Sequence, residues 1–187
     1  MGALLLAAVF PAGCVTPVPA PNSSLDPQTG ATLVVVDQPL VLARDRRDIA
    51  VQARDYLTLV AAEIDEAGHR RLIWAAHQWS TIDARTADVR PAANTELLLV
   101  ADGRDLRFTP LTGQLIADYA RNPALRAPQD ADVITTIYET DAETLAFVAS
   151  SHDLTASFPN SFPLPYTLWK DGRPALTRLL SEVGLQR

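Results

Sequence analysis

The three histidines, His69, His77 and His152, are the first residues to consider for metal binding or proton transfer. Zinc sites need several ligands at short, defined spacings, as in the HExxH motif, and no two of these histidines have such a spacing. The only cysteine is Cys14, near the start of the chain, so the rest of the chain offers no thiolate ligand and no disulfide. The sequence therefore predicts neither a metal site nor a metal cofactor.

A second group of chemically capable residues surrounds His152, which follows Ser150 and Ser151 and precedes Asp153. Serine, histidine and aspartate make up hydrolase triads, but a triad depends on a three-dimensional geometry that adjacency in sequence does not establish. The GxSxG and SxxK motifs are both absent, and the eight glycines form no phosphate-binding loop. We expect no enzymatic activity and no bound cofactor, with a hydrolase as the main alternative.

Aromatic side chains give the clearest indication of a binding surface. Trp74 and Trp79 belong to one predicted strand at positions of opposite parity, so a regular strand directs them to opposite faces. One is expected in the core, and the other lies under a helix, is exposed, or is redirected by a bulge. Phe162 and Tyr166 belong to a stiff, proline-containing segment that is either a connection over the core or a binding loop. Core packing is the favoured interpretation of these aromatic residues, and Trp79, Phe162 and Tyr166 are the candidates for a binding surface as the alternative.

The first 14 residues have the pattern of an export signal. Leu4 to Phe10 form an apolar stretch of the length found in secretory signals. Ala12 and Gly13 then place two small residues directly before Cys14. This pattern resembles the lipobox of bacterial lipoproteins, in which small residues precede an invariant cysteine. The resemblance implies that residues 1–13 are a removed signal peptide and that Cys14 becomes a lipid-modified N-terminus.

By the same resemblance, Val15 in place of an aspartate after the cysteine favours sorting to the periplasmic face of the outer membrane. Two or more acyl chains make such an attachment stable, since each buried methylene contributes about 0.8 kcal/mol. Secretion without a lipid, and a cytosolic location in which Cys14 is incidental, are the alternatives. The longest apolar run, Ala3 to Pro11, is shorter than the ~20 residues of a transmembrane helix.

The chain is acidic, with a net charge of −6, and its positive charges are almost all arginines. Arginines gather at positions 44–47 and 70–71, but Asp45 interrupts the first group and no continuous basic stripe forms. Because nucleic acids require concentrated positive charge, we expect no nucleic-acid partner. With 48% hydrophobic and 20% charged residues, the composition is that of a folded globular protein.

Proline and small polar residues dominate the segment after Cys14. Residues 14–30 are therefore expected to be an extended tether, and residues 31–187 a single domain. Alternating apolar residues and turn signals predict strands over residues 33–36, 49–65, 69–82, 97–101, 106–109 and 133–139. Gly68 and the Asp102-Gly103 pair mark the turns of two hairpins.

Two helices are predicted after most of the strands. Thr140 and Glu143 have the spacing of a capping box, with Thr140 as the N-cap of the first helix. The second helix begins near Pro174, and apolar residues then recur at helical spacing over 176–183. A shorter helix is expected over 115–120. Strands followed by helices predict an α+β domain: a mainly antiparallel sheet with two C-terminal helices packed on it.

The sequence thus predicts a non-enzymatic lipoprotein of the cell envelope whose domain binds or braces another envelope component, such as a protein partner. One alternative is an envelope hydrolase that acts on cell wall or lipid. The other is a carrier that holds a small apolar ligand between the sheet and its helices. A hydrolase requires titratable groups that converge in a cleft, whereas a carrier requires an enclosed apolar cavity.

Overall fold

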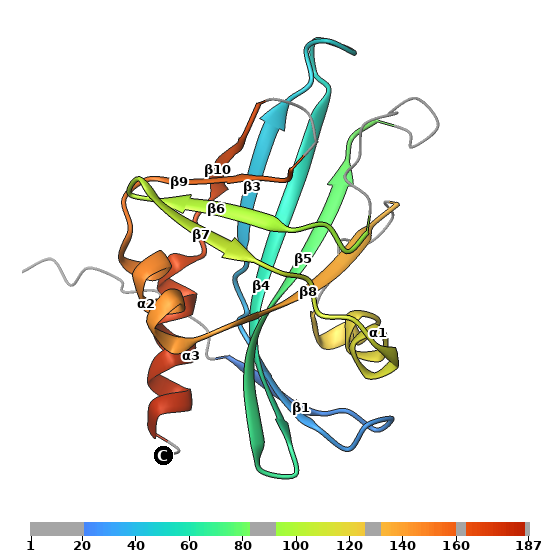
Figure 1. Cartoon of the computed structure of the whole chain (residues 1–187), viewed down its shortest axis with the longest axis vertical. Helices are drawn as coiled ribbons and strands as arrows, with labels where there is room; N and C mark the ends of the chain where they lie inside the picture. Colours follow the sequence, from blue (N-terminus) through green and yellow to red (C-terminus); the bar gives the residue numbers. More distant parts are fainter. Residues whose placement is uncertain (1–20, 83–92, 126–131, 160–163, 186–187) are drawn as a thin grey trace, which may run out of the picture.

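The computed structural model describes residues 21–82, 93–125, 132–159 and 164–185. In this part of the chain, ten strands form one antiparallel sheet against which helices pack (Figure 1). The strands are β1 Asn22–Leu25, β2 Thr32–Val35, β3 Leu40–Asp45, β4 Arg54–Glu66, β5 His69–Ser80, β6 Leu97–Ala101, β7 Arg104–Phe108, β8 Ile134–Thr140, β9 Leu154–Ser157 and β10 Tyr166–Lys170. The helices are α1 Gln114–Ala120, the short 3-10 helix η1 Pro123–Leu125, α2 Ala142–Ser150 and α3 Arg173–Leu185. The domain has the predicted α+β architecture, with α2 and α3 near its C-terminal end.

The two longest strands, β4 and β5, form a hairpin at the centre of the sheet. Ala67 and Gly68 make its turn with positive φ angles of 52° and 87°, a conformation that glycine adopts readily. On its other side β4 pairs with two strands in succession, β3 along its first half and β2 along its last residues. β1 continues the sheet beyond β2, and β8 continues it beyond β5.

The sheet curls so that distant strands approach each other. Beyond β3 follow β10, β9, β6 and β7. The chain after β7 reaches β8, where Pro110 forms a bridge with Tyr138. The backbone amide of Leu111 also donates to the carbonyl of Ile137 at 2.8 Å. Most of the sheet therefore wraps around a common interior, and Figure 1 shows β6, β7 and β9 crossing in front of β4 and β5.

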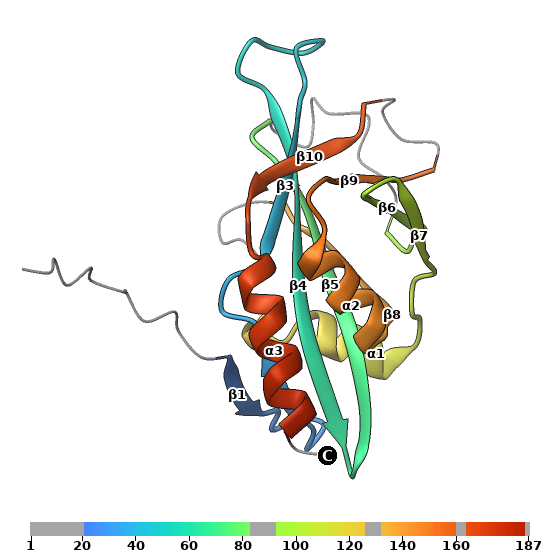
Figure 2. The same ribbon diagram turned by 90° about the vertical axis from the view of Figure 1, so that its left-hand side faces the viewer.

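The helices α2 and α3 lie side by side over the long strands (Figure 2). Apolar residues at helical spacing supply their buried faces, as the sequence predicts. These residues are Leu145 and Val148 in α2, and Leu176, Leu179 and Val183 in α3. Burial of side chains of this size contributes about 1.5–3 kcal/mol each, so the two helices are held chiefly by packing.

Different elements bury the two faces of the central hairpin. On the inner face, Leu57 and Trp74 are fully buried. On the outer face, η1 covers His77, which is also fully buried. The Nε2 atom of His77 lies 3.1 Å from the carbonyl oxygen of Leu125, and its Nδ1 atom lies 2.9 Å from the hydroxyl of Thr135. Because a carbonyl only accepts, Nε2 carries the hydrogen, and burial lowers the pKa of His77.

The folded domain begins earlier than the sequence indicated. Residues 22–30, expected in the tether, form β1 and a turn that leads into β2. Asp26 in this turn is 4% exposed and accepts hydrogen bonds from the amide of Gln28 and the side chain of Asn122. The predicted boundary at Ala31 is therefore wrong, because strand pairing and a distant side chain order this proline-containing segment.

Two further details correct the predicted elements. The expected strand over 49–65 begins only at Arg54, because residues 46–53 form the connection from β3, a strand that the sequence did not reveal. β9 and β10 were also missed. The N-cap of α2 is Asp141, whose carboxylate accepts from the amide of Thr144 at 2.7 Å. Thr140, the predicted cap, is the last residue of β8.

Candidate functional site

The end of the β3–β4 hairpin carries two arginine–aspartate pairs that face opposite sides of the sheet. In the strand register, Arg44 lies opposite Asp55, and Asp45 lies opposite Arg54. Because side chains alternate between faces along a strand, the first pair points inward and the second outward. The connection between the two strands, residues 46–53, lies at the top of Figure 1.

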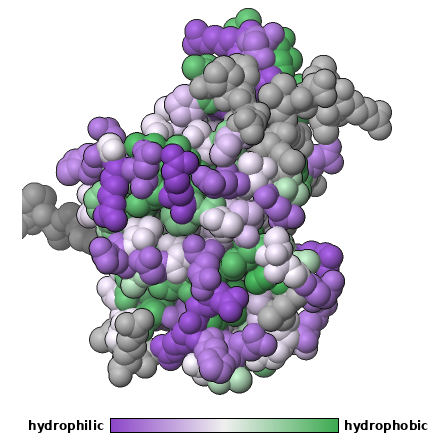
Figure 3. Space-filling view, viewed as in Figure 1, coloured by the Kyte–Doolittle hydropathy of each residue, from purple (hydrophilic) through white to green (hydrophobic). Residues whose placement is uncertain are grey.

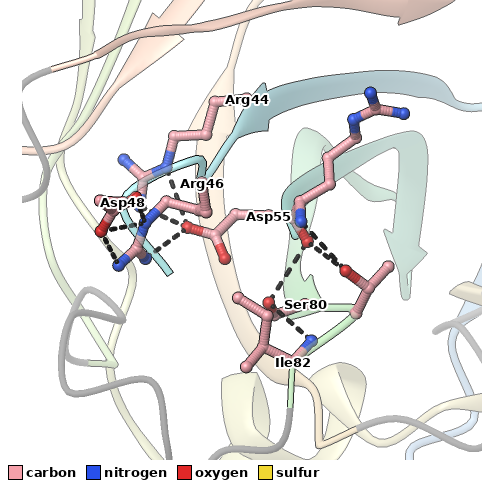
Figure 4. Close-up of polar contacts among 8 residues, drawn as sticks. Arg44, Arg46, Asp48, Asp55, Ser80 and Ile82 are labelled. Atoms are coloured by element: carbon pink, nitrogen blue, oxygen red, sulfur yellow. Dashed lines mark hydrogen bonds and ion pairs between the residues drawn. The ribbon is translucent and has the colours of Figure 1, made fainter. Parts of the chain in front are cut away.

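The inward pair belongs to a largely buried group of charges, Arg44, Arg46, Asp48 and Asp55, which we call the inner cluster (Figure 4). One carboxylate oxygen of Asp55 accepts from Arg44 Nε at 3.0 Å and from Arg46 Nη1 at 3.1 Å. Arg46 also donates from Nε and Nη2 to Asp48, and this hydrogen bonding lowers the pKa of Asp48. The guanidinium of Arg44 lies 4.3 Å from the ring centroid of Tyr166. The cluster therefore joins β3, β4, β10 and the connection.

The inner cluster and local hydrogen bonds give the connection 46–53 a defined shape. The amide of Arg46 donates to the carbonyl of Ala53, and the amide of Ile49 donates to the carbonyl of Arg46. Val51 in this loop is 92% exposed. Figure 3 shows hydrophobic and hydrophilic side chains next to each other at this end of the molecule. An ordered loop thus presents an apolar side chain to solvent.

Among the residues that the structure describes, Trp169 in β10 is the most exposed aromatic residue, and it lies on the outer side of the sheet. Leu168 and Lys170 in β10 pair with consecutive residues of β3, so Trp169 between them is the extra residue of a β-bulge. A bulge redirects a side chain, and Trp169 is 58% exposed. The guanidinium of Arg54 lies over its ring, 4.3 Å from the centroid.

Neighbouring side chains hold Arg54 in this position. Its Nε atom donates to a carboxylate oxygen of Asp45 at 2.9 Å, and its Nη2 atom lies at the same distance from that oxygen. Hydrogen bonding with the side chains of Tyr56 and Asp45 raises the pKa of Arg54. The ring of Tyr56 stacks on Trp79 at 4.1 Å and meets Trp169 edge-on at 6.4 Å. Three aromatic rings and one oriented guanidinium therefore form a continuous row.

A hollow of about 400 Å³ lies beside Trp169 and Arg54. Ala43 lines it, and this small residue lies between Tyr56 and Thr167 in the cross-strand register. A methyl group between larger side chains leaves space above the sheet. The hollow is also lined by Asp45, Leu164 and Pro165. We call this hollow, together with Arg54, Tyr56, Trp79 and Trp169, the aromatic surface.

The structure separates the residues that the sequence grouped as a binding surface. Trp79 is half-buried within the aromatic surface. Tyr166 lies on the inner side of the sheet, where it is 1% exposed and packs edge-on against Phe158 at 6.2 Å. Tyr166 thus belongs to the core, which corrects that part of the prediction. Phe162 and Cys14 lie outside the described residues.

Trp169 and Arg54 were not predicted as site residues. The position of Trp169 depends on a bulge, and the position of Arg54 depends on pairing with β3, and neither leaves a local pattern in the sequence. The one available signal was a tryptophan followed directly by Lys170 and Asp171, a polar context that is unusual for a core residue.

The residues around His152 do not form a catalytic triad. The hydroxyls of Ser150 and Ser151 donate to backbone carbonyls within α2. The side chain of His152 is 94% exposed, and its Nδ1 atom lies 3.8 Å from the carboxylate of Asp102. Asp102 accepts from the backbone amides of Asp153 and His152, and these hydrogen bonds lower its pKa. These contacts end a helix and brace the β6–β7 turn.

A second hollow, of about 420 Å³, lies between α1 and β8 and bears on the carrier alternative. Its apolar lining residues include Leu111, Ile116 and Val133, which are half-buried, and Arg121 at its edge is exposed. This hollow opens to solvent, whereas a carrier of an apolar ligand needs an enclosed cavity.

Comparison with known proteins finds no relative: no protein-family model matches the chain, and no curated protein or solved structure is significantly similar to it. Across the described ranges, no group of three histidine, cysteine, aspartate or glutamate side chains has the arrangement that a metal ion requires. No helix in this part of the chain is both long and apolar enough to cross a membrane. The functional interpretation therefore depends on the aromatic surface.

Proposed function

We propose that this protein is a lipid-anchored, non-enzymatic binding protein of the bacterial cell envelope, and that it binds its partner through the aromatic surface. The lipobox-like pattern that ends at Cys14 supports the anchor, and Val15 supports the periplasmic face of the outer membrane. The partner is another envelope component.

The observation that carries the proposal is the exposure of Trp169 beside a hollow. Large aromatic side chains are normally buried, and an exposed one next to a concavity is typical of a binding site. Arg54 is already oriented by Asp45, and the bulge fixes the backbone at Trp169. A surface whose side chains are ordered before binding loses less conformational entropy when the partner arrives.

The fold also separates the aromatic surface from the point where the chain enters the domain. Asn22 pairs with Val35, which in turn pairs with Ala62 of β4. The hollow is lined by Ala43, which pairs with Tyr56, and Tyr56 lies six residues before Ala62 in β4. At ~3.3 Å per residue, about 20 Å of strand separates Tyr56 from Ala62. This separation leaves room for a partner in front of the aromatic surface.

The anchor is tested by replacing Cys14 with alanine in the full chain. We expect the wild-type protein to incorporate labelled palmitate and to partition into the detergent-rich phase after phase separation. Cys14→Ala should lose both properties and keep the mass of the unprocessed chain. An unchanged mass and unchanged partitioning would show that Cys14 is not lipidated.

The binding surface is tested in cells with a photocrosslinking residue, p-benzoylphenylalanine, in place of Leu164 at the hollow. The matched control carries the same residue in place of Leu25, which is also exposed but lies on β1. We expect adducts from the first position only, and a loss of these adducts when Trp169→Ala is added. Equal adducts from both positions, or adducts that persist without Trp169, would contradict the proposed surface.

A further inference from the structure

We propose that the hollow of the aromatic surface binds a neutral sugar ring of an envelope glycan. This inference rests on the proposed function and names the chemical class of the partner. Three features that meet at the hollow support it: an exposed tryptophan ring, an arginine–aspartate pair, and a concave space of limited size.

The exposed ring of Trp169 suits the apolar side of a sugar. A pyranose ring with equatorial hydroxyls carries C–H groups on its faces, and these can cover an indole ring and displace water from it. One face of Trp169 is already stacked by Arg54. The bulge leaves Trp169 as a whole residue 58% exposed, so a ligand can reach this side chain.

The charged pair beside the ring suits hydroxyl groups. A sugar hydroxyl both donates and accepts, so its site needs donors and acceptors together. Arg54 supplies guanidinium donors, and Asp45 supplies carboxylate acceptors. Their side chains are 30% and 43% exposed, so a ligand can reach them. The carboxylate of Asp45 also lies 3.6 Å from the exposed guanidinium of Arg47. Donors and acceptors that lie side by side in this way suit the hydroxyl groups of a neutral ligand.

The size and shape of the hollow limit what it can accept. A volume of about 400 Å³ lies near the lower end of the ~300–1,000 Å³ of small-ligand sites. This space suits one or two sugar rings, and it is too small for a helix or a strand of a folded partner. The hollow is open to solvent, so the remaining sugars of a longer glycan can continue outside it.

The inner cluster stabilises this site from the opposite face of the sheet. Arg44 and Asp55 lie on the same two strands as Asp45 and Arg54, one position away along each strand. Hydrogen bonds among the buried charges hold β3 and β4 together next to the hollow. Weak ligands such as single sugars gain most from such a preformed site, since little of the binding energy is spent on ordering the protein.

The proposal is tested with purified full-length lipoprotein in a detergent that has no sugar headgroup. The probes are three neutral tetrasaccharides: chitotetraose and cellotetraose, which are β-1,4-linked, and maltotetraose, which is α-linked. Binding is followed by calorimetry and by tryptophan fluorescence. We expect saturable millimolar binding of at least one β-linked probe, and weaker binding of maltotetraose because its curved chain leaves the hollow at a different angle.

Variants connect this binding to the site. Trp169→Ala should weaken binding by about tenfold or more, whereas Trp169→Phe, which keeps a smaller aromatic ring, should lie between Trp169→Ala and the wild type. Leu25→Ala removes another exposed apolar side chain, on β1, and should bind as the wild type does. Circular dichroism checks that all variants are folded.

The outcomes separate the two proposals. If no tetrasaccharide binds, or if Trp169→Ala binds as tightly as the wild type, the glycan proposal is wrong. If photocrosslinking at Leu164 nevertheless depends on Trp169, the aromatic surface still has a partner, and that partner is a protein or a lipid. Trp169-dependent binding to phosphatidylethanolamine vesicles, without sugar binding, would identify a membrane surface instead.

Discussion

Two arginine–aspartate pairs lie one residue apart on β3 and β4, with similar chemistry and opposite surroundings. Arg44 binds Asp55, and its guanidinium lies 4.3 Å from the ring of Tyr166. Arg54 binds Asp45, and its guanidinium lies 4.3 Å from the ring of Trp169. Both rings belong to β10. The Asp55 side chain is 5% exposed and that of Asp45 is 43% exposed, so burial is the main difference between the pairs.

This comparison shows how one chemical arrangement takes two roles. A buried charge that loses its partner is costly, because water cannot replace the partner, so the inner pair is needed for stability. An exposed pair contributes little to stability because water competes for both charges. The outer pair and its tryptophan are therefore available for binding, and a change there should affect binding more than folding.

The largest effect is expected from Asp55→Ala. This change removes the carboxylate that Arg44 and Arg46 share, and both guanidinium groups are buried. We expect the free energy of unfolding to fall by about 3–5 kcal/mol, measured by urea denaturation. Asp55→Asn, which keeps the shape and removes the charge, should also destabilise the protein. If Asp55→Ala were as stable as Asp45→Ala, the assignment of the inner pair to stability would be wrong.

The two aromatic partners should differ in the same way. Tyr166→Ala creates a cavity beneath Arg44 and beside Phe158, and we expect it to cost about 3 kcal/mol. Trp169→Ala removes a side chain that is more than half exposed, so its cost should stay below about 1 kcal/mol. Thermal and urea unfolding of the two variants provide the comparison. A larger loss for Trp169→Ala would mean that this residue serves the fold.

The strand faces, the turns and the buried helix face depend on local patterns, and these features were predicted from the sequence. Alternation placed Trp74 and Trp79 on opposite faces of one strand, and Gly68 and Gly103 located two turns, where both have positive φ. The spacing of leucines also placed the buried face of α3. Such patterns are set by the period of a strand or a helix, so neighbouring residues are sufficient to reveal them.

The candidate site itself could not be predicted, because it depends on contacts between distant segments. Trp169 is exposed through a bulge against β3, and Tyr166, three residues earlier, is buried by Arg44 and Phe158. Both residues are aromatic, so residue type alone does not show which of them is buried. Only the pairing of β10 with β3 decides which of them reaches solvent, and that pairing spans more than a hundred residues of chain.

His77 lies on the same outer face of the sheet as Trp169. The face is exposed at Trp169, whereas η1 covers it at His77. The unfolded chain binds a proton at His77 below about pH 6.5, whereas burial lowers the pKa of the folded state. Stability from this group is therefore present above pH 6.5 and is lost as the pH falls, by up to about 1.4 kcal/mol per unit. Urea denaturation between pH 7 and pH 5 measures this slope, and His77→Gln should reduce it. An equal slope in the variant would assign the effect to other groups.

The smallest effect on stability is expected from Asp45→Ala, and this change gives the sharpest comparison with Asp55. Asp45 orients Arg54 through its Nε and Nη2 atoms, but both side chains are partly solvated. We expect the midpoint of urea denaturation to stay close to that of the wild type, and added salt to reduce the remaining difference, because ions screen exposed pairs. The same salt should leave the larger loss in Asp55→Ala nearly unchanged. Binding to the partner should nevertheless fall in Asp45→Ala, since without Asp45 the guanidinium of Arg54 is no longer fixed beside the hollow. If Asp45→Ala unfolded the protein or left Trp169-dependent crosslinking intact, the outer pair would not be the binding counterpart of the inner one.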